Sequence, residues 1–236
     1  MIIEVTGEPG IGKTTLLREI CSRLDCKPIL YSDNLVLRHF KFDFIRSVFL
    51  RKISTDILLF LLFLPYIKKY KNFLLHAVNI LKDVNESKMF KINILRNIIL
   101  KLGRFEFISK NFAHKIVLVD EGISHIPFNL IDYGGKREIN LESIFASLES
   151  IVSKVKVVVL YHKSINIGLR LTLRGHQRIK KKARYSVDQF VYLNNRLAEA
   201  YKSMPGGVFL DKRVLELGTE RDYREIVPFF ERIIEK

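Results

Sequence analysis

The sequence predicts an α/β fold in which a parallel sheet of five strands is covered by helices on both faces. Two observations lead to this prediction. Short, almost continuously apolar runs recur along the 236-residue chain, as is typical of strands buried on both faces of a parallel sheet. Between these runs lie longer segments whose apolar residues repeat at helical spacing, so strands and helices alternate.

The regular elements follow from these patterns. The five predicted strands are residues 2–5, 28–31, 115–119, 155–161 and 207–210. Predicted helices cover residues 14–24, 141–152 and 187–204. The last helix is expected to begin at the capping box Ser186-x-x-Gln189 and to end at Pro205-Gly206.

Residues 35–114 form the longest stretch without a predicted strand, and their mixture of Leu, Ile, Phe, Lys and Arg indicates several amphipathic helices. Residues 56–66 are apolar nearly all round, which predicts a helix buried between neighbours or in an interface. Lys68, Lys69 and Lys71 follow this segment, so a helix lying on a membrane surface is the alternative.

The formal net charge is +15, and two segments account for all of the excess. Residues 35–114 contain 15 Lys and Arg against 5 Asp and Glu, and residues 163–184 contain 8 basic residues and no acidic one. Such segments attract phosphates, nucleic acid or anionic lipid, although a solvated basic face has the same composition.

A glycine-rich loop follows the first predicted strand. Residues 7–14 read GEPGIGKT, the pattern G-x-x-x-x-G-K-T of a phosphate loop. Its glycines allow consecutive backbone N–H groups to turn inward at the positive end of the following helix. We expect Lys13 to reach the β- and γ-phosphates of ATP, and the Thr14 hydroxyl to bind Mg²⁺. The predicted nucleotide-binding residues in this segment are Gly7, Glu8, Pro9, Gly10, Ile11, Gly12, Lys13, Thr14 and Thr15.

Two acidic residues, Asp120 and Glu121, directly follow the predicted strand at 115–119. Asp120 stands where an aspartate holds the Mg²⁺ shell beside the threonine of the loop. Glu121 has two interpretations. An acid after that aspartate commonly orients or deprotonates water, which favours an ATPase, but it also occurs as a supporting or capping carboxylate.

A basic segment follows the fourth predicted strand. Arg170, Arg174 and Arg178 recur at intervals of four, with Gly175 interrupting a continuous helix. Arginines on a mobile flap would stabilise charge at the γ-phosphate and exclude water on closure. The alternative is a surface loop that binds polyanions non-specifically.

These features together resemble the P-loop kinases of the nucleoside-monophosphate kinase type, thymidylate kinase most nearly. The likeness rests on GEPGIGKTT at 7–15, the strand before Asp120, and the order strand 155–161, helix with Arg170, RGHQR at 174–178 and capped helix with Phe190 and Tyr201. It covers most of the chain outside residues 35–114. The resemblance implies a three-layer P-loop NTPase with strand order 2-3-1-4-5.

The resemblance also implies roles for the arginines. Arg170 and Arg174 would flank the adenine and phosphates, and Arg178 and Arg184 are candidates for a lid at residues 174–186. One departure concerns the acceptor. Thymidylate kinases carry an Asp-Arg-Tyr or similar triplet where this chain has Asp120-Glu121-Gly122, so dTMP is not the expected acceptor.

A second, shorter likeness involves residues 31–34. YSDN resembles the end of the second strand in shikimate kinase and adenylylsulfate kinase, where the acid contacts the acceptor hydroxyl. Asp33 would then orient or deprotonate an acceptor alcohol. A helix N-cap is the alternative, because a helical pattern begins at Leu35.

The chain is predicted to be a single domain, residues 1–236, with a helical insertion at 35–114 and the lid. Because the first strand begins at residue 2 and no apolar stretch approaches a membrane span, we expect a cytoplasmic protein. Cys21 and Cys26 suit neither a disulfide framework nor zinc spacing, which indicates reduced thiols.

The leading functional hypothesis is an ATP- and Mg²⁺-dependent small-molecule kinase. Its anionic acceptor would lie beneath the insertion, held by Arg38, Arg96 or Arg104. ATP is preferred because no GTP-selective Asn/Thr-Lys-x-Asp pattern is present and because of the resemblance to the kinases named above. The alternatives are an ATPase or switch whose insertion contacts a partner, and a nucleotide-binding scaffold without turnover. The sequence leaves nucleic acid, a membrane surface and a second copy of the chain open as partners.

Overall fold

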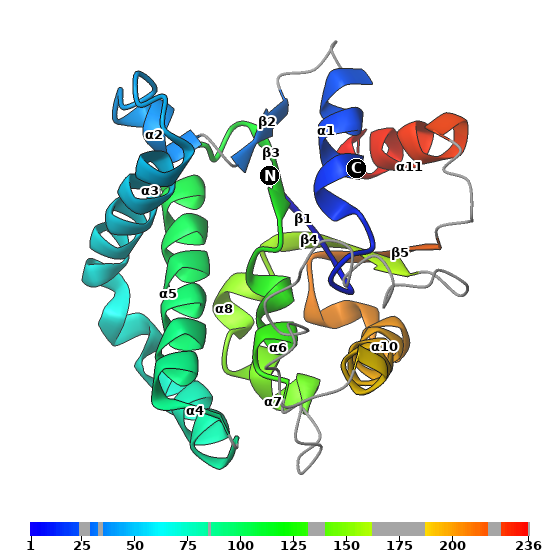
Figure 1. Ribbon diagram of the computed structural model, residues 1–236. Coiled ribbons are helices and arrows are strands. Elements are labelled where there is room, and N and C mark those ends of the chain that lie inside the picture. Colours follow the sequence, from blue (N-terminus) through cyan, green and yellow to red (C-terminus); the bar gives the residue numbers. More distant parts are fainter. Residues whose placement is uncertain are drawn as a thin grey trace.

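A computed structural model describes residues 1–23, 29–32, 35–84, 86–131, 140–161, 187–216 and 223–235. Within them, five parallel strands form one sheet in the order β2-β3-β1-β4-β5, which confirms the predicted α/β class and strand order (Figure 1). The strands are β1 Ile2–Gly7, β2 Ile29–Tyr31, β3 Ile116–Asp120, β4 Val155–Tyr161 and β5 Asp211–Glu216.

The central strand β1 lies between β3 and β4, and its side chains alternate between the two faces. Val5 faces the layer made by α1 (Lys13–Arg23) and α11 (Tyr223–Glu235) and is fully buried there. Ile2 belongs to the core on the opposite face. Side chains there come from α5 (Lys88–Asn111), α7 (Leu141–Ala146), α8 (Glu149–Val152) and α10 (Val187–Ser203). In the register of the sheet, Val5 pairs with Asp120 of β3, so the carboxyl ends of these strands lie side by side.

The predicted fifth strand at residues 207–210 is wrong. Gly206–Val208 form a 3₁₀ helix, η4, and the strand begins afterwards, at Asp211. β5 lies at the sheet edge and is only partly buried, so its sequence, DKRVLE, lacks a continuous apolar run. The apolar residue that suggested a strand, Phe209, packs against Phe145 in the core with ring centroids 5.0 Å apart.

The helix predicted at 141–152 is divided in two, α7 Leu141–Ala146 and α8 Glu149–Val152. At the break, the Ser147 hydroxyl donates to the carbonyl of Ile144 at 2.6 Å, a local bond that competes with helical continuation. The remaining short elements after β3 are η3 Ile123–His125 and α6 Ile126–Asn129, and α10 spans Val187–Ser203.

The described part of the segment between β2 and β3 contains helices joined by turns, and no strand. The helices are α2 Leu35–His39, α3 Val48–Phe63, α4 Ile67–Asp83 and α5 Lys88–Asn111, with the 3₁₀ turn η2 Leu64–Tyr66 between α3 and α4. Helix α5 lies between α3 and the rest of the molecule (Figure 1). The α3–α5 contact is close at Gly103, where a Cβ atom would lie 2.4 Å from the carbonyl oxygen of Leu59.

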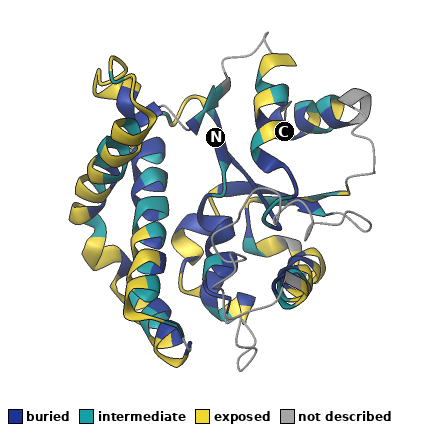
Figure 2. Cartoon of the chain, in the orientation of Figure 1, coloured by how far each residue is buried: buried dark blue, intermediate teal, exposed yellow. Residues whose placement is uncertain are grey.

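Residues 56–66 are predicted to be buried between neighbours or in an interface, and within this chain only one side of the helix is buried. Leu59 and Phe63 are buried against α5, whereas the opposite side of α3 is exposed (Figure 2). A helix can be apolar all round in sequence and still have a neighbour on one side only. None of the described helices combines the length and the apolar character needed to cross a membrane.

Candidate functional site

The glycine-rich loop lies between the carboxyl end of β1 and the first turn of α1. Gly7, Gly10 and Gly12 have φ values of +140°, +87° and +96°, which side-chain-bearing residues rarely adopt. At Gly7, a Cβ atom would also lie 2.5 Å from the carbonyl oxygen of Leu160 in β4. The loop therefore has the glycine-dependent backbone and the helix N-terminus that an anion-binding cradle requires.

Thr14 and Asp120 meet beside this loop, although 106 residues separate them in the chain. The Thr14 hydroxyl donates to Oδ2 of Asp120, because parallel pairing of β1 and β3 brings the end of β3 next to the start of α1. Mg²⁺ at phosphate sites is commonly held by one or two protein ligands together with substrate phosphates and water. The residues present fit such a site, with Thr14 and Asp120 as the two protein ligands.

The Lys13 side chain is buried and lies back along the loop. Its Nζ donates to the carbonyl oxygens of Gly7 at 3.1 Å and Glu8 at 2.9 Å, and lies 3.0 Å from Oε1 of Glu121. The Lys13 ammonium group thus lies against the backbone of the glycine-rich loop, and the carboxylate of Glu121 balances its charge.

Glu121 lies at a sharp turn after β3, with φ +53°. Its backbone N–H donates to the carbonyl of Val5 at 3.2 Å, and its Oε2 lies 3.5 Å from Nε2 of His125. Desolvation by itself raises the pKa of this carboxyl, but His125, Lys13 and Lys101 outweigh it and hold the pKa below its usual range. Glu121 is therefore ionised and is a weak proton acceptor.

Glu4 holds the chain that follows Glu121, a role that the sequence reasoning missed. Its carboxylate, buried in β1, accepts from the backbone N–H groups of Ile123 at 2.9 Å and Ser124 at 2.7 Å. Burial raises the pKa of Glu4, and these hydrogen bonds oppose the rise. A Cβ atom at Gly122 would overlap Glu4 Oε1, so a larger residue there requires this hydrogen-bonded carboxylate to move. The signal in the sequence was a charged residue inside an otherwise apolar strand.

Tyr201 supports the same segment from α10. Its side chain is fully buried, and its hydroxyl donates to the carbonyl oxygen of Ser124. The ring stacks on Phe128 with centroids 5.6 Å apart, and Phe128 stacks on His125 at 4.8 Å. These contacts fix the imidazole beside Glu121.

Lys101 brings the segment between β2 and β3 to the site. It lies on α5, and its Nζ donates to the backbone carbonyl of Glu121. Burial lowers the pKa of Lys101 to about 8; the negative charges of Glu121, Glu4 and Asp120 act against this fall, and Arg104 adds to it. Sequence reasoning named arginines on these helices and missed this lysine.

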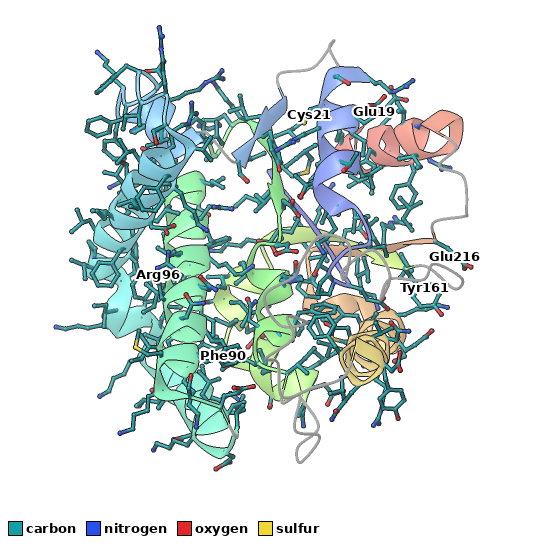
Figure 3. All side chains as sticks on the ribbon, in the orientation of Figure 1. Glu19, Cys21, Phe90, Arg96, Tyr161 and Glu216 are labelled. Atoms are coloured by element: carbon teal, nitrogen blue, oxygen red, sulfur yellow. The ribbon has the colours of Figure 1, made fainter. Side chains whose placement is uncertain are left out.

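The three arginines named for an anionic acceptor lie in different surroundings. Arg96 pairs with Asp56 of α3 and so joins two helices (Figure 3). Arg104 is close enough to Lys101 to affect its pKa, whereas Arg38 is exposed on α2. Of the three, only Arg104 lies near the residues gathered around Glu121.

Glu8 is buried within the loop itself. Burial raises the pKa of its carboxyl to about 7; Lys13 opposes the rise and Glu199 adds to it. With its amide nitrogen turned toward this carboxylate, Asn195 of α10 donates to both oxygens, at 2.7 and 2.9 Å. The loop is therefore tied to α10 as well as to β4.

Several predicted site residues lie outside the described residues. They are Asp33 and the arginines of the basic segment and lid, Arg170, Arg174, Arg178 and Arg184. Comparison with models of known protein families and with curated proteins finds no match for this chain.

Proposed function

We propose that this chain is a P-loop kinase that transfers the γ-phosphoryl group of ATP to a small, anionic acceptor, with Mg²⁺. The observation that carries the proposal is the position of Lys101. A cation from the segment between β2 and β3 lies against the backbone of Glu121, next to the Thr14–Asp120 pair. The site thus has a second cation besides Lys13, and in this proposal that cation attracts the anionic group of an acceptor toward the γ-phosphate.

In this proposal each described residue has a distinct role. The backbone N–H groups of the loop bind the phosphates, and Lys13 exchanges Glu121 for the β- and γ-phosphate oxygens. Thr14 and Asp120 would hold Mg²⁺, which would neutralise phosphate charge when bound. Lys101 attracts the acceptor. From the sequence, Asp33 would orient the acceptor, and Arg170, Arg174 and Arg178 would close over ATP.

The state of Glu121 supports an acceptor other than water. A general base works best with a pKa near the working pH, and the cations around Glu121 lower its pKa instead. Lys13 lies 3.0 Å from one carboxylate oxygen and the imidazole of His125 lies 3.5 Å from the other. When Lys13 binds phosphate instead, His125 and Lys101 remain beside Glu121. A carboxylate in these surroundings is suited to positioning cations, and it is poorly suited to removing a proton from water.

An ATPase or nucleotide switch is the second candidate. Oε1 of Glu121 is 3.0 Å from Lys13, so this carboxylate would lie near the γ-phosphate of a bound nucleotide. There it could orient an attacking water, as acids at this position commonly do.

The two candidates are separated by measuring ATP consumption by the purified protein alone and with pools of small phosphorylated or carboxylated metabolites. A kinase consumes little ATP alone and responds to one pool, and Glu121→Gln keeps most of that response. Brisk hydrolysis without any acceptor that is abolished by Glu121→Gln would contradict the kinase. Lys13→Ala serves as the inactive control, and Glu19→Gln, on the outer side of α1, as the matched charge control.

A further inference from the structure

Helix α3 has a continuous apolar surface on the side facing away from α5. We define the α3 outer face as Phe49, Leu50, Ile53, Ile57, Phe60, Leu61 and Leu64, all of which are exposed. Their spacing of three and four residues places them in one stripe along the helix. Figure 2 shows this side of α3 exposed along its length. Exposed apolar surface of this extent indicates an interaction site.

The stripe continues beyond the helix at both ends. Phe44, before α3, is 72% exposed, and Ile67, at the start of α4, is 43% exposed. This exposed stripe does not belong to the core, because the opposite side of α3 is the side that is buried against α5. Leu59 and Phe63 are 1% exposed there, and the backbones of α3 and α5 approach as closely as Gly103 permits.

Basic side chains accompany this apolar surface. Residues 38–75 contain eight Lys and Arg against two Asp and Glu. Of the two acids, Asp56 is engaged by Arg96. Exposed lysines and arginines precede the stripe, lie along it and follow it: Lys41, Arg46, Lys52, Lys68 and Lys71.

An apolar stripe bordered by basic side chains fits some kinds of partner better than others. A second copy of the chain would place two strongly basic segments against each other, which charge repulsion disfavours. A nucleic acid would use the cations and leave the seven apolar side chains of the outer face in water. An anionic bilayer uses both, because acyl chains receive the apolar stripe while lipid phosphates meet the lysines and arginines.

We propose that the α3 outer face docks this protein on anionic membrane surfaces, with α3 lying in the plane of the interface. This does not require a membrane-spanning helix. The docking surface is separate from the proposed kinase site, because α5 lies between α3 and the sheet (Figure 1), and it is Lys101 of α5 that contacts Glu121. The proposals of membrane docking and of phosphoryl transfer can therefore be tested independently, and failure of one would not contradict the other.

The test is sedimentation of the full chain with vesicles of phosphatidylcholine, alone or with one third phosphatidylglycerol. We expect binding to the anionic vesicles, little to the neutral ones, and weaker binding as salt rises. The double variant Ile57→Glu/Leu61→Glu should lower partitioning by at least about tenfold, because two carboxylates would enter the interface. Both positions are exposed, at 54% and 52%, so the variant should keep the circular dichroism and melting temperature of the parent.

The matched control is Leu210→Glu, at a position 58% exposed just before β5, which should bind vesicles as the parent does. Lys68→Glu/Lys71→Glu should reduce the preference for anionic vesicles. Failure of the parent to bind anionic vesicles, or equal binding by the Ile57→Glu/Leu61→Glu variant, would overturn the proposal. A parent that is dimeric, does not bind vesicles and becomes monomeric with this variant would assign the face to a second copy instead.

Discussion

The ammonium nitrogen of Lys13 lies 3.0 Å from Oε1 of Glu121, so the lysine of the glycine-rich loop is paired with the acid that follows Asp120. Two parts of the site are linked by this contact. A nucleotide phosphate that binds Lys13 must compete with Glu121, and the released carboxylate then retains His125, 3.5 Å from its other oxygen, as a partner. The pair couples binding at the loop to the position of the chain after β3.

Glu121→Gln is expected to bind ATP more tightly than the parent. The neutral amide holds Lys13 less strongly, and the loss of one charge-assisted contact corresponds to about tenfold in Kd. Isothermal titration calorimetry measures this directly. Lys13→Ala should abolish binding in the same assay, and Glu19→Gln should leave it unchanged; weaker binding by Glu121→Gln would argue against the competition.

Asp120→Asn is expected to remove the contribution of Mg²⁺ to nucleotide binding. Because an amide binds Mg²⁺ more weakly than a carboxylate, MgATP affinity should fall by about tenfold or more, while the affinity for ATP in EDTA should not fall. Asp211→Asn, on the edge strand beside Arg213, is the matched control. Equal losses with and without Mg²⁺ would show that Asp120 acts on the fold rather than on the metal.

Gly122→Ala is expected to destabilise the protein by about 1–3 kcal/mol, because the new Cβ must displace a buried carboxylate. That atom would lie 2.0 Å from Glu4 Oε1, whereas a Cβ at Gly207 has no neighbour within 4 Å. Gly207→Ala is therefore the matched control and should change the free energy of unfolding by less than about 0.5 kcal/mol. Urea unfolding of both variants measures the difference, and equal stabilities would contradict the role assigned to Glu4.

Affinity for phosphate-bearing ligands should fall as the pH rises through about 8, where Lys101 loses its proton. Lys101→Met should bind more weakly at pH 7 and lose this step, while Lys110→Met, on the exposed end of the same helix, should keep it. Binding titrations between pH 6.5 and pH 9.5 would show whether the step exists.

The same pKa shift makes a second prediction, for stability. The folded pKa of Lys101 lies below its unfolded value of 10.5, so between about 8 and 10.5 the unfolded chain binds the extra proton. Stability contributed by Lys101 therefore rises with pH across this window. The free energy of unfolding of the parent, relative to Lys101→Met, should increase over the same range, and a decrease would mean that the charged form is favoured by folding.

The sequence by itself indicated four of the five strands and the loop, because both depend on local signals, whereas the strand order was implied only by the resemblance. Apolar runs buried on two faces mark the inner strands, and glycines that must adopt positive φ mark the turn between β1 and α1. The same reasoning failed at β5, where an edge strand with charged residues carries no such run. For residues 56–66 it left burial between neighbours and burial in an interface open, because composition does not reveal how many neighbours a helix has within its own chain.

Only the tertiary structure decided which distant residues meet at the site. Lys101 and Glu4 belong to no sequence motif. Helix packing brings Lys101 to the backbone of Glu121, and the position of β1 in the sheet brings Glu4 to the backbone of Ile123. The low pKa of Glu121 arises in the same way, from His125, Lys13 and Lys101, which lie on three separate elements. Charge interactions depend on distance through space and on burial, which sequence spacing does not supply.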